Sequence, residues 1–184
     1  MEEILRKITE FGYHAHGNQQ RKYTPDLYMV HPVRVMEQCK NYTQDVTVLA
    51  AALLHDVLED TPIGEEELKN YLLTVMPQTQ AEDTLKYVIE LTDVYVKENF
   101  PKLNRRTRKA KELERLRTVS PEAQTIKYAD ILDNSLEIIP YDPDFARVYL
   151  REVKTILQTL DLGNPELREK TLKVVEDGLK QLSR

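Results

Sequence analysis

The sequence predicts an all-α fold, a single-domain helical bundle of about eight helices. Apolar residues recur at helical spacing along nearly the whole chain, as at Ile4, Ile8, Phe11 and Ala15. The five glycines are too few for a loop-rich or β-rich design. With 184 residues, the chain can bury one proper core and has no obvious room for a second domain, so residues 1–184 are expected to form one unit.

Prolines and capping residues set the expected helix boundaries. Pro32 can open a helix that runs to about Lys40, because the first helical position needs no N–H group. Asp45 or Thr47 is expected to cap a helix that carries HDVLED as one continuous segment and ends at Thr61-Pro62. The other helices are expected at about residues 2–16, 64–74, 79–97 and 104–117, from Ser120 to Pro140, from Asp142 to near Gly163, and at about 165–183 as a C-terminal packing helix.

Composition and charge exclude several classes of protein. The formal net charge of −5 argues mildly against a general nucleic-acid or acidic-membrane binder. The single cysteine, Cys39, cannot form an internal disulfide, and the N-terminal segment has no apolar signal-peptide core, so a cytoplasmic protein is expected. The longest apolar run, Val48 to Leu54, is far shorter than the roughly 20 residues of a membrane-spanning helix.

The segment AALLHDVLEDTP, residues 51–62, places one imidazole and three carboxylates within two helical turns, directly after an apolar run. On a continuous helix, Glu59 lies one turn beyond His55 and Asp56, and Asp60 one turn beyond Asp56. Carboxylates this close repel one another unless a cation lies between or beside them. The cluster therefore indicates a site for a divalent metal ion.

A stable metal site needs more protein ligands than His55 and Asp56. Two histidines and two aspartates would leave an octahedral ion two open positions, one for water and one for a substrate oxygen. The remaining donors could come from five candidates elsewhere in the chain: His14, His16, His31, Asp130 and Asp133.

These residues resemble the HD phosphohydrolase superfamily, whose signature is a histidine, a His-Asp pair and a distant aspartate in that order. HDVLEDT is similar in particular to the pyrophosphohydrolase domain of Rel/Spo alarmone enzymes, and the size of the chain resembles that of the stand-alone small alarmone hydrolases. The likeness covers about residues 5–160. It rests on HGNQQRK at 16–22, Tyr28 before His31-Pro32, AALLHDVLEDT at 51–61, Leu91-Thr92, and IKYADILDN at 126–134.

The resemblance implies an HD-type helical fold and removal of the 3′-pyrophosphate of ppGpp and pppGpp with manganese. A metal-activated water would displace the phosphorus joined to the 3′ oxygen, without a covalent enzyme intermediate. The metal ligands implied are His31, His55, Asp56 and Asp130.

The resemblance also implies the catalytic and substrate-binding residues. Glu59 and Asp60 would orient and deprotonate the attacking water. Arg21 would lie against the nucleotide base, with Lys22 beside it in the substrate-binding segment, and Asn134 would hydrogen-bond near the ribose or a phosphate.

The chain departs from the family pattern at three places. Residues 25–28 read Pro-Asp-Leu-Tyr where the family usually has Gly-Glu-Pro-Tyr. Ile131 and Asp133 stand where the long enzymes have arginine and histidine. A synthetase domain is absent, so this chain is expected to degrade an alarmone and not to make one.

A basic stretch from Lys102 to Arg117 has three interpretations. It could be a solvated helix face, a set of cations that neutralises a substrate with several phosphates, or a nucleic-acid-binding surface. No aromatic residue interleaves the run, which disfavours nucleic acid. For the phosphate interpretation we select Asn104, Arg105 and Lys109, because the last two share a helix face.

Structural roles remain open for several candidates. Glu59 and Asp60 could be an ordinary helix-end pair, and His16 could be polar support or an active-site residue. Tyr23, Tyr28 and Tyr128 are expected to pack more often than to contact substrate.

Three function classes fit these residues: an alarmone 3′-pyrophosphohydrolase, which the Glu59-Asp60 pair favours; another HD phosphohydrolase acting on an adenine alarmone, NADPH, a nucleoside monophosphate or a cyclic nucleotide; and a non-catalytic binding module. The expected partner in each enzymatic class is a small nucleotide, with no nucleic acid and no membrane, and the oligomeric state is left open.

Overall fold

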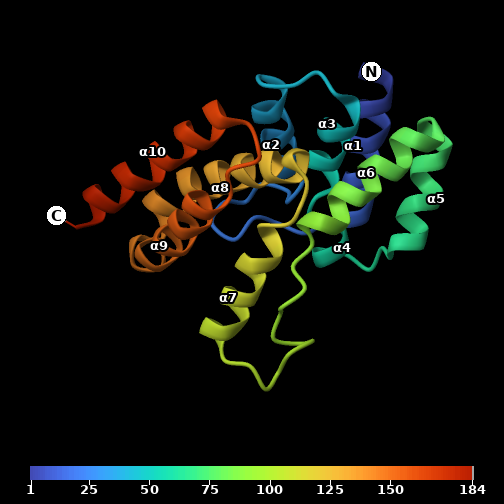
Figure 1. Cartoon of the computed structure of the whole chain (residues 1–184). Coiled ribbons are helices and arrows are strands. Elements are labelled where there is room, and N and C mark those ends of the chain that lie inside the picture. The colour runs from blue at the N-terminus through green and yellow to red at the C-terminus, as the bar shows by residue number, and fades with distance from the viewer. Residues whose placement is uncertain (184) are drawn as a thin grey trace.

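The computed structural model describes residues 1–183, and this part of the chain contains ten helical segments and no β-strand (Figure 1). The prediction of an all-α fold is therefore confirmed. The segments are α1 (Glu2–His16), α2 (Val30–Lys40), α3 (Val46–Leu54), α4 (Val57–Asp60), α5 (Glu65–Val75), α6 (Gln78–Leu91), α7 (Arg105–Leu116), α8 (Pro121–Tyr141), α9 (Pro143–Thr159) and α10 (Pro165–Leu182).

The central helix is α3, which packs against α1, α2, α6 and α8. Eight of its nine residues, Thr47 to Leu54, are buried. Asp45 caps it by accepting a hydrogen bond from the backbone N–H of Thr47, which satisfies one of the free donors at the helix start. The apolar run that precedes His55 is thus buried on all sides, and this holds the end of the helix in the interior.

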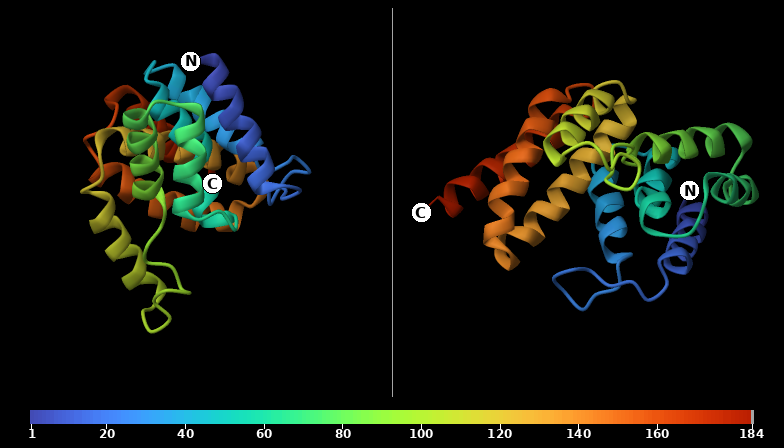
Figure 2. Two further views of the ribbon diagram at one scale, coloured as in Figure 1. Left: turned by 90° about the vertical axis from the view of Figure 1, so that its right-hand side faces the viewer. Right: turned by 90° about the horizontal axis from the view of Figure 1, so that it is seen from below.

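The long helix α8 joins the two halves of the molecule. It contacts α2, α3 and α6 on one side and α9 and α10 on the other, so the last two helices cover its outer face (Figures 1 and 2). Ser120 caps α8, and Asn164 caps α10. Leu167 and Val175 of α10 are fully buried, so this helix packs its apolar side against the rest of the bundle. Among residues 1–183, no helix combines the length and the hydropathy that crossing a membrane would need.

The segment from residue 92 to α7 projects away from the body of the molecule as an arm (Figures 1 and 2). Its base is fixed by Glu112, whose carboxylate accepts hydrogen bonds from the backbone N–H groups of Val94 and Tyr95 at 3.1 and 3.0 Å. Arg115 donates to the carbonyl oxygen of Glu90 at 2.9 Å. The basic residues of α7 are therefore presented beside the bundle, with the C-terminal half of the helix anchored in it through Glu112 and Arg115.

The predicted continuous helix through HDVLED is wrong. Helix α3 ends at Leu54, and a separate four-residue helix, α4, begins after Asp56. The ring Nδ1 of His55 lies 2.8 Å from the carbonyl oxygen of Ala52, which the backbone N–H of Asp56 would use in an unbroken helix. The histidine side chain thus competes with the helical hydrogen bond and separates the two segments.

Three other boundaries also differ from prediction. Helix α6 ends at Leu91 instead of about residue 97, because the backbone N–H of Asp93 donates to the carboxylate of Glu59 and not to a helical carbonyl. Helix α8 continues through Pro140 to Tyr141, since a proline in the last turn costs only one hydrogen bond there. Helix α9 ends at Thr159, a few residues before the predicted end near Gly163.

Candidate metal centre and active site

Four side chains from three regions of the chain meet in the interior: His31 on α2, His55 and Asp56 at the α3–α4 break, and Asp130 on α8. The Nε2 atom of His31 lies 3.3 Å from Asp130 Oδ1 and 3.7 Å from Asp56 Oδ2. The Nε2 atom of His55 lies 3.1 Å from Asp56 Oδ2 and 3.9 Å from Asp130 Oδ1. One donor atom each of His31, His55 and Asp56 lie within 4.8 Å of one another. The sequence-predicted ligand set is thus brought together around one point.

Both histidines are oriented by their Nδ1 atoms. His31 Nδ1 lies 2.7 Å from Asp133 Oδ2, and His55 Nδ1 lies 2.8 Å from the carbonyl oxygen of Ala52. Because each partner is an acceptor, the proton is assigned to Nδ1 in each ring. In the neutral form of each ring, the lone pair of Nε2 then points toward the carboxylates of Asp56 and Asp130, where it could bind a metal ion.

The protein supports both aspartates from outside the cluster. The Tyr28 hydroxyl donates to Asp56 Oδ2 at 2.7 Å. Asn134 donates to Asp130 Oδ1 at 2.6 Å, and the ammonium group of Lys127 donates to Asp130 Oδ2 at 2.9 Å. These bonds fix the orientation of the carboxylates before any ion binds.

Ionisation of the four groups is strongly perturbed. Burial lowers the pKa of both imidazoles, but their acidic neighbours offset this, so that the pKa of His31 is raised and that of His55 is raised to about 9. Burial raises the pKa of Asp56 and Asp130, and nearby cationic groups lower it by more. Both aspartates are therefore ionised at neutral pH. The two histidines retain protons, which a metal cation would have to displace.

The donor set fits a divalent ion. His55 Nε2 is buried and has no hydrogen-bond partner among residues 1–183, although Asp56 Oδ2 is only 3.1 Å away. A buried nitrogen without a partner is costly unless another group binds it. Two imidazoles and two carboxylates suit manganese, iron, cobalt, nickel or zinc. A divalent ion held by His31, His55, Asp56 and Asp130 would satisfy the unpaired nitrogen and balance the two negative charges.

Glu59 lies at the rim of this cluster, on α4. Its carboxylate accepts a hydrogen bond from the backbone N–H of Asp93, although more than a third of the residue is exposed. Desolvation of the carboxylate, followed by repulsion from Asp93, raises the pKa of Glu59 to about 7. A carboxylate titrating above its ordinary range at the edge of a metal site can accept a proton from water near neutral pH.

Asp60 follows Glu59 on the short helix and is exposed. Asp60 lies close to the hydroxyl group of Tyr28. Burial raises the pKa of this hydroxyl most, and the nearby carboxylates of Asp56 and Asp60 raise it further. Asp60 therefore lies on the Tyr28 side of the centre, and Glu59 on the Asp93 side. The α3–α4 break, and not a single helical face, brings both acids to the rim.

The loop between α1 and α2 carries the predicted base-binding residue. Arg21 Nε lies 3.2 and 3.3 Å from the two carboxylate oxygens of Glu137, and its guanidinium donates to Asn134 Oδ1 at 2.9 Å. The guanidinium carbon lies 5.5 Å from the centre of the Tyr28 ring. Arg21 is thus largely buried and linked through Asn134 to Asp130 of the cluster. Lys22, in contrast, is exposed and lies over the rings of Tyr23 and Phe145.

Two cavities adjoin the centre, and both are lined by Asn134 and Phe145. The first, of about 300 Å³, lies between α7, α8 and α9 and includes Asp130. Its cationic lining residues are Arg105, Lys109 and Lys127. The second, of about 320 Å³, is lined on the loop side by Gln19, Gln20, Arg21, Lys22, Tyr23 and Tyr28. A ligand with an aromatic group and several phosphates could therefore reach both cavities from one position at the centre.

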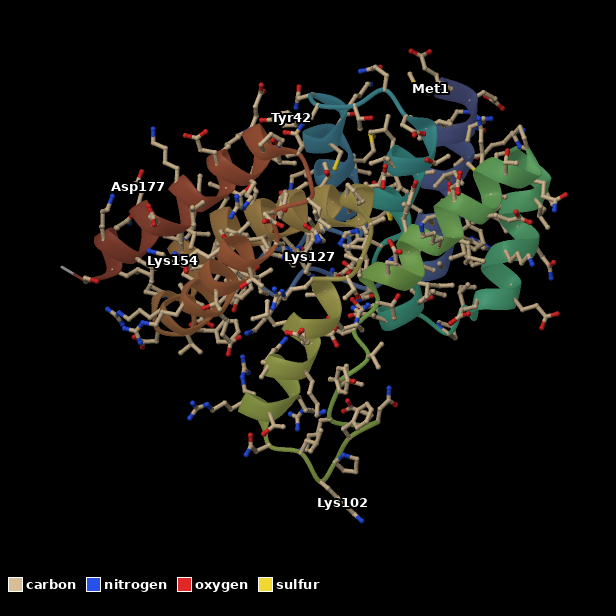
Figure 3. The ribbon with its side chains drawn as sticks, viewed as in Figure 1. Met1, Tyr42, Lys102, Lys127, Lys154 and Asp177 are labelled. Carbon is tan, nitrogen blue, oxygen red and sulfur yellow. The ribbon has the colours of Figure 1, made fainter. Side chains whose placement is uncertain are left out.

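The structure separates the residues selected from the basic stretch. Arg105 and Lys109 line the first cavity and pair there with Glu152 at 2.7 Å and Asp93 at 3.7 Å. Asn104 caps α7 instead, accepting a hydrogen bond from the backbone N–H of Thr107 at 2.9 Å. Lys102 lies at the tip of the arm and points away from the bundle (Figure 3). The helix thus directs Arg105 and Lys109 toward the cavity, while Glu112 and Leu116 are buried against the bundle.

Comparison with known proteins agrees with this geometry. The HD domain family model matches residues 28–135, which include all four clustered side chains. The chain belongs to the HD domain family.

Relatives of this HD domain include the mouse protein named guanosine-3′,5′-bis(diphosphate) 3′-pyrophosphohydrolase MESH1. It is 33% identical over 136 residues, with 71% of this chain and 66% of the relative covered. A Haemophilus influenzae protein of the same enzyme name is 30% identical over 175 residues, which are 92% of this chain but only 23% of that protein. This HD domain thus spans less than two thirds of the mouse protein and less than a quarter of the bacterial one.

A solved structure has the same fold as this HD domain. Its title is "A metazoan ortholog of SpoT hydrolyzes ppGpp and plays a role in starvation responses". The two chains superpose with a TM-score of 0.77 at 26% identity, over 96% of each. The predicted HD-type fold is thereby confirmed.

Sequence reasoning missed several residues of this HD domain site. Lys127 lies within the motif IKYADILDN and lines the first cavity beside Asp130. Its spacing of three residues from Asp130 was the available signal. Tyr28 was expected to pack, and it does stack on His16, with ring centres 4.6 Å apart, but its hydroxyl also binds Asp56. Asp133, one of the five possible ligands, lies behind His31 instead of inside the cluster.

Proposed function

We propose that this HD domain removes the 3′-pyrophosphate of guanosine alarmones, converting ppGpp and pppGpp to GDP and GTP plus pyrophosphate, with Mn²⁺ as its metal. The observation that carries the proposal is the position of Glu59, a proton acceptor with a raised pKa, beside a cluster of two histidines and two aspartates. The names of the mouse and Haemophilus relatives support the substrate.

The residues divide the reaction between them. Glu59 takes a proton from a water molecule as its oxygen attacks the phosphorus joined to the ribose 3′ oxygen, and Asp60 orients that water. The bond between this phosphorus and the 3′ oxygen breaks, the 3′ oxygen takes up a proton from solvent, and GDP or GTP leaves with a 3′ hydroxyl together with pyrophosphate. The bound divalent ion supplies positive charge that polarises a phosphate and makes water more acidic.

Each of the two cavities can accommodate one end of the substrate. Arg105, Lys109 and Lys127 line the first and can neutralise phosphate oxygens. Arg21 lies over the Tyr28 ring beside the second, where its planar cation can also contact a base, while Asn134 stands where both cavities meet. Lys22, exposed at the mouth of the second cavity, can approach a phosphate or the base edge.

A substrate panel tests the proposal. The purified protein is incubated with Mn²⁺ and, separately, ppGpp, pppGpp, ppApp, NADPH, AMP and cyclic AMP, and released pyrophosphate and phosphate are measured. Pyrophosphate from ppGpp and pppGpp is the expected result. Single phosphate from NADPH or AMP would assign the site to another nucleotide, and no turnover with any metal would make this a binding module.

Replacing Arg21 by alanine is expected to raise KM for ppGpp by roughly tenfold while changing kcat by less than about threefold. Arg21 contacts the substrate away from the bond that breaks, so the loss falls on binding. Steady-state kinetics measures both constants. Arg6→Ala is the matched control, because Arg6 pairs with Glu3 and Glu10 on the exposed face of α1. A large drop in kcat at unchanged KM would contradict a base-binding role.

The pH dependence of kcat/KM should follow the ionisation of Glu59. The carboxyl must be deprotonated to accept a proton from water, and its pKa is raised from the ordinary 4.5 to about 7. We therefore expect kcat/KM to rise with pH, with the midpoint of the rise displaced above 4.5 toward 7. An acidic limb centred near 4.5 would show that a solvated carboxylate, and not Glu59, controls the rate.

A further inference from the structure

His31 contacts a second acid, Asp133, on the side of its ring that faces away from the metal cluster. Asp130 and Asp133 lie three residues apart on α8, so both face the same side of the helix. Asp130 Oδ1 lies 3.3 Å from His31 Nε2, and Asp133 Oδ2 lies 2.7 Å from His31 Nδ1. The imidazole is therefore held between two carboxylates of one helix, one on the metal side and one behind.

Arg34 holds Asp133 in this position. It lies one turn beyond His31 on α2, and its guanidinium donates to both Asp133 oxygens, at 2.7 and 3.0 Å. The same guanidinium donates to Glu137 at 2.9 Å, and Glu137 also binds Arg21. Two acids and two guanidinium groups thus balance one another behind the centre, and Asp133 can stay ionised although it is only 8% exposed.

The second histidine lacks such a carboxylate. His55 Nδ1 bonds the backbone carbonyl oxygen of Ala52, a neutral acceptor. A carboxylate accepts a stronger hydrogen bond than a carbonyl, and it makes the other ring nitrogen a better electron donor. The two nitrogen donors of the centre are therefore unequal, and His31 is the stronger one.

We propose that Asp133 is a positioning residue for the metal centre. As an ionised acceptor pinned by Arg34, it fixes the His31 ring with Nε2 toward Asp56 and Asp130 and strengthens that nitrogen as a ligand. This inference rests on the proposed metal site but not on the identity of the nucleotide, so metal binding alone can test it.

Asp133→Asn is the decisive variant, because it keeps the size of the side chain and an oxygen acceptor while removing the charge. We expect the dissociation constant for Mn²⁺, measured by competition with a chelator, to rise by roughly 10- to 100-fold. The absorption spectrum of the Co²⁺-substituted protein should shift, because the ligand strength of one nitrogen changes. The Tm of the metal-free protein reports any separate loss of folding.

Two further variants separate ligand tuning from simple stability. Asp177→Asn is the matched control, since Asp177 pairs with Lys180 on the exposed side of α10, and its Mn²⁺ affinity should equal that of the wild type. Arg34→Gln removes the cation that pins Asp133 but leaves the charged carboxylate on His31, so the Mn²⁺ dissociation constant should rise by clearly less than in Asp133→Asn. The Co²⁺ spectrum of Arg34→Gln should likewise shift less than that of Asp133→Asn.

Several outcomes would overturn the inference. One is wild-type Mn²⁺ affinity and an unchanged Co²⁺ spectrum in Asp133→Asn. Another is an equal loss of affinity and of metal-free Tm in Asp133→Asn and Arg34→Gln, which would show that the network serves folding. Failure of the wild type to bind Mn²⁺ would overturn it as well. Tight Mn²⁺ binding that weakens in Asp133→Asn, without hydrolysis of ppGpp, would support the inference and reject the proposed substrate.

Discussion

We expect His55→Ala to lose its bound divalent ion and its hydrolase activity together. The imidazole is almost completely buried, and its Nε2 atom has no hydrogen-bond partner among residues 1–183, so this nitrogen is available to bind the ion. Its removal leaves the negative charges of Asp56 and Asp130 without one of the groups that organise a cation between them. Asp56→Ala should have the same effect, since it removes an anionic ligand that contacts both histidines.

Elemental analysis after gel filtration measures the bound ion, and pyrophosphate release measures turnover. A third readout is thermal: a ligand that binds only the folded state raises Tm, so a chelator should lower the Tm of the wild type but not that of His55→Ala. His14→Ala is the matched control, because His14 is exposed on α1 and lies outside the cluster. Full metal content in His55→Ala would remove His55 from the ligand set, and turnover without metal would refute the proposed role of the ion.

The sequence predicted most helices because their boundaries depend on local chemistry. Pro32, expected at the first helical position, is instead the third residue of α2, which begins at Val30, but it still lies in the first turn, where the helix does not need its N–H group. Asp45, Ser120 and Asn164 each cap their own helix, so their effects are readable from neighbours in the chain. The break at His55 depends on the competition between a ring nitrogen and a backbone N–H for one carbonyl. Because hydrophobic periodicity does not reveal that competition, the sequence predicts one continuous helix for this segment.

From the sequence, only those site residues that belong to a recognisable motif could be predicted. The pairing of His31 with Asp133 joins positions 102 residues apart, and the bond between Glu59 and the backbone of Asp93 joins positions 34 apart. Such contacts follow from the packing of α2 on α8 and of α4 beside the end of α6, which a single sequence does not specify. For Asn104, the local sequence supports two interpretations. Its position before a helix indicates a capping role, whereas its place in a basic run suggests substrate binding.

Glu59→Gln should keep the metal and lose the rate. The substitution preserves the size of the side chain, and Glu59 is not one of the four residues that we propose hold the ion, so the metal content should equal that of the wild type. The amide cannot accept the proton of the attacking water. Because general base catalysis contributes roughly 10²- to 10⁴-fold, we expect kcat to fall by about that factor with little change in KM.

The control for Glu59→Gln is Glu66→Gln, an identical chemical change at an exposed position in the first turn of α5, which should retain wild-type kcat. The variant also tests the source of the pH dependence. If Glu59 is the base, the residual activity of Glu59→Gln should no longer show the acidic limb near 7, because the titrating carboxyl is gone. Full activity in Glu59→Gln would transfer water activation to another group, with Asp60 the first to examine. Loss of metal together with rate would instead show that Glu59 helps to hold the ion.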